Sequence, residues 1–138
     1  MKKFISCMFI FAMSFSLYGV AEVAVIVNTE NSNEIQADEI PRIFLGKVKT
    51  YGNGDAIEPI NSGAGDATRS QFEEGVLNKS SSQVKAYWSK LVFSGKGKPL
   101  KEVPSDADVL NYVAANKGAI GYVDASNVND SVKVISTK

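Results

Sequence analysis

The chain contains no histidine and a single cysteine, which removes several kinds of site at once. Without histidine there is no Ser-His or Cys-His nucleophile pair, and the commonest transition-metal ligand is missing. Neither charge sign is in excess, since 15 acidic residues balance 15 basic ones, so the overall charge gives no reason to expect nucleic acid or an anionic membrane as a partner. The 44% of hydrophobic residues among 138 nevertheless indicate one packed domain.

The first 21 residues have the pattern of a secretory signal peptide. Lys2 and Lys3 precede an apolar stretch, residues 4–17, and small residues follow at Gly19 and Ala21. The apolar stretch is shorter than the roughly 20 residues that a transmembrane helix needs, although a retained N-terminal anchor is an alternative interpretation. We therefore expect cleavage after Ala21 and, for a bacterial source, export to the periplasm or the medium.

The mature chain, residues 22–138, would have no membrane span, a net charge of −2 and no cysteine, because Lys2, Lys3 and Cys7 are lost with the signal peptide. The lack of cysteine excludes disulfides, thiol redox chemistry and zinc sites with thiolate ligands. We expect no cofactor.

Hydrophobic periodicity predicts strands separated by helices along the mature chain. Apolar runs predict strands at residues 23–27, 56–61, 119–123 and 132–135, and helices are expected at residues 37–46, 66–78, 80–92 and 105–118, with a basic loop at residues 94–104. This order is typical of an α/β domain in which a mixed, mostly parallel sheet lies between helices in three layers. Within the third helix, Trp88 occupies the centre of a complete apolar stripe, so we expect it in the core.

One local feature could form a binding site. Residues 61–69 (NSGAGDATR) are expected to comprise the end of a strand, a glycine-containing loop and the start of a helix. The N–H groups of Gly63 and Gly65, with the partial positive charge of the helix N-terminus, could hold an anion. Thr68 adds a hydroxyl and Arg69 a guanidinium. The alternative is an ordinary turn in which Asp66 caps the helix and Arg69 is solvated.

Several short sequence motifs resemble those of the periplasmic phosphate-binding proteins of ABC transporters (PstS-like). They occur in the same order as in short members of that family. They are Ile43-Phe-Leu-Gly-Lys47, Thr50-Tyr-Gly-Asn-Gly54, Thr68-Arg-x-x-Phe72, Tyr87-Trp-Ser89, Phe93-Ser-Gly95 and Gly118-Ala-Ile-Gly-Tyr-Val123. The resemblance implies a type II periplasmic-binding-protein fold. It also implies that phosphate or a similar oxyanion is bound without catalysis and passed to a membrane permease.

Two departures from the family pattern bear on this interpretation. The mature chain is long enough for about one of the two lobes between which such proteins bind their ligand. The family's loop reads Arg-x-x-Gly-Ser-Gly-Thr, whereas this chain matches it only at Gly65 and Thr68 and has Ser62, Asp66 and Ala67 at the arginine, serine and second glycine positions. Asp66 would repel an anion and occupy the helix donors itself.

The sequence thus supports two functions, neither of them enzymatic. The first is oxyanion binding at a site made of Ser62, Gly63, Gly65, Asp66, Thr68 and Arg69. The second is a single-lobe periplasmic adaptor or sensor subunit that has lost anion binding and acts through a protein partner. Glu73-Glu74 and Ser89-Lys90 are adjacent pairs on helices and face different directions, so neither forms a catalytic pair.

Export predicts a mature protein that begins at Glu22. Intact mass of the protein recovered from the periplasm or the medium checks this, and a recovered form that still carried residues 4–17 would contradict it.

Overall fold

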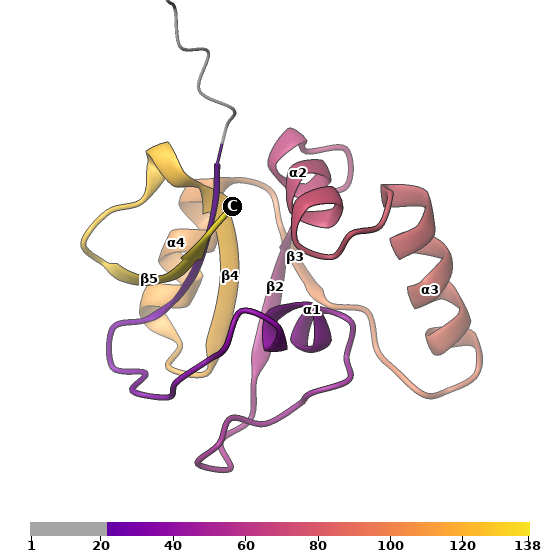
Figure 1. Cartoon of the computed structure of the whole chain (residues 1–138), viewed down its shortest axis with the longest axis horizontal. Coiled ribbons are helices and arrows are strands. Elements are labelled where there is room, and N and C mark those ends of the chain that lie inside the picture. Colours follow the sequence, from indigo (N-terminus) through magenta and orange to yellow (C-terminus); the bar gives the residue numbers. More distant parts are fainter. Residues whose placement is uncertain (1–21) are drawn as a thin grey trace, which may run out of the picture.

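The computed structural model describes residues 22–138, so the signal-peptide prediction lies outside the described residues. Among those residues, no helix has the length and apolar character needed to cross a bilayer. The described chain forms one sheet with helices on both faces (Figure 1).

The sheet has five strands in the order β3-β2-β4-β1-β5. Their bounds are β1 Val23–Asn28, β2 Glu58–Ser62, β3 Lys101–Val103, β4 Ala119–Asp124 and β5 Val132–Thr137. Strand β2 pairs in parallel with β3 and β4, whereas β1 pairs antiparallel with β4 and β5. The prediction of a mixed sheet is confirmed, but the sheet is not mostly parallel. Two pairings are parallel and two are antiparallel, and the antiparallel ones are grouped at the β5 edge.

The helices divide between the two faces of the sheet. Their bounds are α1 Glu39–Phe44, α2 Ala67–Gly75, α3 Ser81–Phe93 and α4 Asp106–Ala115, with a short 3-10 turn η1 at Ala125–Asn127. Buried side chains of α1 and α2 pack with alternate residues of β1 and β4, and those of α4 pack on the opposite face. The predicted three layers are confirmed.

Local signals explain where most helices begin. Asp66 accepts a hydrogen bond from the Thr68 N–H and starts α2, and Ser80 and Gln83 form a capping box at the start of α3. Pro41 lies in the first turn of α1, where its missing N–H does no harm. Gly46 follows α1 with a φ of +73°, as expected of a glycine that ends a helix.

Two predictions of local structure are wrong. Part of the expected basic loop is strand β3, because three residues at an edge carry too little pattern to be recognised. The helix expected to end at Gly118 has its C-cap at Asn116. A glycine is needed at residue 118 because a Cβ there would lie only 2.7 Å from the carbonyl oxygen of Ala56.

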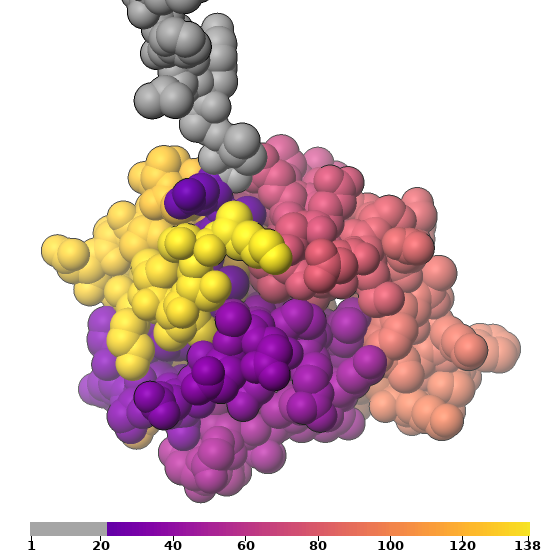
Figure 2. All heavy atoms as spheres, viewed as in Figure 1, coloured from indigo at the N-terminus to yellow at the C-terminus, as the bar shows by residue number. Residues whose placement is uncertain are grey.

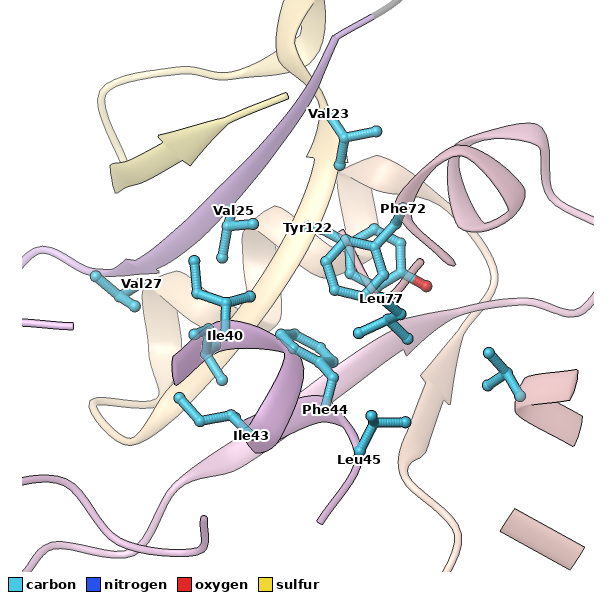
Figure 3. Close-up of a cluster of buried hydrophobic side chains, with 12 residues drawn as sticks. Val23, Val25, Val27, Ile40, Ile43, Phe44, Leu45, Phe72, Leu77 and Tyr122 are labelled. Atoms are coloured by element: carbon cyan, nitrogen blue, oxygen red, sulfur yellow. The ribbon is translucent and has the colours of Figure 1, made fainter. Parts of the chain in front are cut away.

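The core below α1 and α2 centres on three aromatic rings, two of which are visible stacked in Figure 3. Phe72 and Tyr122 stack with their centroids 3.9 Å apart, and Phe44 meets Phe72 edge-on at 4.7 Å. All three side chains are almost completely buried. This cluster joins α1 and α2 to the central strand β4.

Trp88 lies outside this core, contrary to the prediction. Helix α3 stands at the end of the molecule, beyond α2 (Figure 1), and Val84 is its one buried residue. Trp88 is half-buried against the turn at Gly46, and Phe93 is 96% exposed. The apolar stripe of α3 is therefore wider than the surface that the rest of the described chain offers it.

Phe72→Ala should lower the free energy of unfolding by about 3–5 kcal/mol, since a fully buried ring is lost from the cluster. Trp88→Ala should cost clearly less, because its ring is only half-buried. Equilibrium urea unfolding measures both values, and an equal or larger loss for Trp88→Ala would show that α3 contributes more to the core than its packing indicates.

Candidate ligand-binding site

The predicted loop joins the end of β2 to the start of α2. Gly65 has a φ of +84°, a conformation that favours glycine, and the Asp66 N–H donates to the Gly63 carbonyl at 3.1 Å. These features turn the chain into α2 beside the exposed residues Ala64 and Gly65. Among the described residues, the N–H groups of Gly65 and Ala67 meet no hydrogen-bond acceptor.

Asp66 occupies part of this donor set itself. Its Oδ1 accepts the Thr68 N–H at 2.8 Å, which places a carboxylate at the positive end of the helix. The expectation that Asp66 caps the helix is confirmed. A free anion at this helix end would therefore meet a negative charge already in place.

Arg69 is neither solvated nor directed at the open end of the loop. Its Nη1 donates to Glu102 Oε1 at 2.7 Å and to the Ser62 carbonyl at 3.0 Å, and its Nε lies 3.7 Å from Glu73 Oε2. Burial alone would lower the pKa of Arg69, but the hydrogen bond to Glu102 and the nearby negative charges raise it above its usual value. The guanidinium is thus a fixed cation held between two carboxylates.

The two carboxylates that hold Arg69 are site residues that sequence reasoning missed. Glu73 is 3% exposed and also accepts a hydrogen bond from the Ser81 hydroxyl at 2.7 Å, which links α2 to α3. Its spacing of four from Arg69 was an available signal. Glu102 reaches the site from β3, 33 residues along the chain, and no local pattern indicates that contact.

A second network lies beneath the loop, in the core. Tyr122 donates to Asn61 Oδ1 at 2.6 Å and accepts the Ser62 N–H at 3.2 Å, which fixes the end of β2. Burial raises the pKa of the Tyr122 phenol above its usual value, with a smaller opposing effect from Ser62. Ser62 is completely buried, and its hydroxyl has no hydrogen-bond partner among the described residues.

The six predicted site residues therefore occupy three environments. Gly63 and Gly65 lie in the accessible loop, Asp66 and Thr68 form the cap of α2, and Ser62 and Arg69 bind one another below it. The loop borders a groove of about 600 Å³ between α2 and α3. Arg69, Glu73 and Glu102 line one end of that groove, and apolar side chains line the other: Val84, Trp88, Val92, Phe93, Pro99 and Leu100.

Comparison with known families decides what kind of domain this is. A family model described as a PBP superfamily domain matches residues 11–137. The chain belongs to this family. The match to the family model confirms the resemblance that the sequence motifs indicate.

Solved structures share the fold of this PBP domain. An ABC-type phosphate transport receptor from Vibrio cholerae matches 83% of the chain with a TM-score of 0.65 and 20% identity. A phosphate ABC transporter substrate-binding protein from Clostridium perfringens, solved with bound phosphate, matches 83% with a TM-score of 0.66 and 21% identity. PstS from Borrelia burgdorferi matches 84% with a TM-score of 0.63 and 17% identity.

The PBP domain spans less than half of each of these structures. The matched shares are 46%, 45% and 47% of the V. cholerae, C. perfringens and B. burgdorferi chains. The chain is therefore a short member, similar to one lobe of those proteins.

Proposed function

We propose that residues 22–138 form an exported, non-catalytic solute-binding domain that takes phosphate or a similar oxyanion at the loop between β2 and α2. Export to the periplasm or the medium rests on the signal-peptide pattern of the first 21 residues. A membrane permease or another periplasmic protein would receive the solute. The lack of histidine supports a role in binding over nucleophilic catalysis.

The observation that carries this proposal is the set of donors at the start of α2. The N–H groups of Gly65 and Ala67 meet no acceptor among the described residues, and the helix adds partial positive charge. Asp66 already places a carboxylate oxygen on the Thr68 N–H, so this helix end does accept anionic oxygen. The ligand named for the C. perfringens neighbour, phosphate, belongs to the same chemical class.

The electrostatics around the loop limit the expected affinity. Arg69 is the cation nearest to the donors, and its charge is already matched by Glu73 and Glu102, while Asp66 adds a further negative charge. An incoming anion must displace the Asp66 carboxylate or draw Arg69 away from Glu102. We therefore expect binding in the millimolar range, which corresponds to only about −4 kcal/mol.

One observation favours the second candidate function, an adaptor or sensor subunit without a solute. Glu73 and Glu102 neutralise the charge of Arg69 within the domain. Such pairing is expected of a domain that no longer binds an anion. In that case a protein partner would cover the groove between α2 and α3. Titration of the protein with phosphate and sulfate distinguishes the solute-binding function from the adaptor function.

Isothermal titration of the mature protein with phosphate and sulfate tests the proposal. Asp66→Ser should tighten binding by about 0.3–1 kcal/mol, because it removes a negative charge from the helix N-terminus and leaves a good capping residue. Glu102→Gln should tighten it by a similar amount, because Arg69 is released. Arg69→Ala should weaken it by about 1.5–3 kcal/mol.

Glu74→Gln is the matched control. Glu74 is exposed on the same helix, so the variant removes one carboxylate from α2 without releasing Arg69. If no binding is detectable at millimolar phosphate or sulfate in the wild type, in Asp66→Ser or in Glu102→Gln, the oxyanion proposal fails and the adaptor function takes its place.

A further inference from the structure

Positive charge is concentrated in one segment of this nearly neutral protein. Residues 75–101 contain six lysines and no acidic residue, whereas the whole chain has as many acidic as basic residues. The segment runs from the end of α2 through helix α3 and the loop that follows it to the first residue of β3. Figure 2 shows this segment, coloured pink to orange, at one end of the molecule.

This end of the molecule contains a hollow that is separate from the loop at residues 62–69. The hollow has a volume of about 560 Å³, within the range of small-molecule sites, and lies between the turn after α1 and the segment from α3 to β3. Its apolar lining residues are Ile43, Val48, Ile57, Pro59, Tyr87, Trp88, Leu91 and Leu100. We call it the basic hollow because of the residues around it.

Four exposed lysines, Lys47, Lys49, Lys96 and Lys98, complete the lining of the basic hollow, and no acidic side chain contributes to it. Among the described residues, none of these lysines has a carboxylate within 4.0 Å. An apolar surface bordered by unpaired cations is complementary to a molecule with an apolar body and an anionic group.

The aromatic part of the lining is held in place. The Tyr87 hydroxyl donates to the Leu45 carbonyl at 2.7 Å, which ties α3 to the end of α1, and Tyr87 packs edge-on against Trp88 at 5.8 Å. Trp88 in turn covers Gly46, where a Cβ would lie 2.9 Å from its Cη2 atom. The hollow is therefore a preformed feature, and a ligand would lose little affinity to reorganisation.

We propose that the basic hollow binds a small amphipathic anion, such as a medium-chain carboxylate, with its apolar body against Trp88 and its acid group among the lysines. A second copy of the chain does not suit the site, because two copies facing each other here would bring two sets of lysines together. Inorganic phosphate does not suit it either, because phosphate has no apolar body. The inference is therefore independent of the proposed oxyanion site.

Trp88 is the only tryptophan in the sequence and reports on the hollow directly. The mature protein is titrated at low ionic strength with dodecanoate below its aggregation concentration, and Trp88 emission is recorded. We expect saturable binding that is about tenfold tighter than for neutral or cationic amphiphiles of the same chain length, and that weakens with added salt. A rise in the melting temperature distinguishes binding to the native state from unfolding by an amphiphile.

Paired lysine variants locate the site, since Trp88 also borders the groove between α2 and α3. Lys96→Gln/Lys98→Gln should weaken dodecanoate binding about tenfold. The control Lys85→Gln/Lys117→Gln removes the same charge and should change it less than twofold, because Lys85 lines the other groove and Lys117 lines neither.

Four further comparisons test the proposal: the charge of the amphiphile, the two double variants, other anionic partners, and competition with phosphate. Equal affinity for anionic and cationic amphiphiles, or equal effects of the two double variants, would overturn it. So would binding only to phosphatidylglycerol vesicles, or only to an acidic peptide, with none to monomeric dodecanoate. Failure of phosphate to displace dodecanoate would support two separate sites, and loss of phosphate binding alone would affect only the oxyanion proposal.

Discussion

The cluster around Arg69 is the interaction on which the arrangement of this domain depends. One guanidinium joins the end of β2 through the Ser62 carbonyl, strand β3 through Glu102 and helix α2 through Glu73. Strand β3 is only three residues long and lies at the sheet edge, so this ion pair adds a side-chain link to its short backbone ladder. Glu73 extends the cluster to α3 through Ser81. Arg69, which lies beside the loop of the proposed site, is thus also a structural element.

These contacts of Arg69 lower the affinity that we expect of the proposed oxyanion site. A solute anion would have to compete with the Asp66 cap and with the carboxylate of Glu102, whose contact with Arg69 stabilises the β2–β3 edge. Four lysines that pair with no carboxylate among the described residues line the basic hollow instead. The lysines that could attract an anion therefore lie around the basic hollow and not at the loop between β2 and α2. These two surfaces of the domain differ in their chemistry.

Most of the fold could be predicted from the sequence because its signals are local. Capping residues such as Ser80 and Asp66 marked helix starts, and the apolar runs of β1 and β4 marked the buried strands. What failed depends on distant contacts. The pattern around Trp88 predicted a buried helix face, but no described element covers the far part of that face. The sequence predicts the loop between β2 and α2 and its Asp66 cap, whereas the partnership of Arg69 with Glu102 arises only when β3 reaches β2.

The proposed anion site at the start of α2 is one whose affinity the protein's own charges reduce. Backbone amide chemical shifts of nitrogen-15-labelled protein, recorded during a phosphate titration, test this proposal. We expect progressive, saturable shifts at Gly65, Ala67 and Thr68, with little change at Lys96 and Lys98. Amides at residues 65–68 that stay unchanged at millimolar phosphate, or shifts confined to the lysines of the basic hollow, would contradict it.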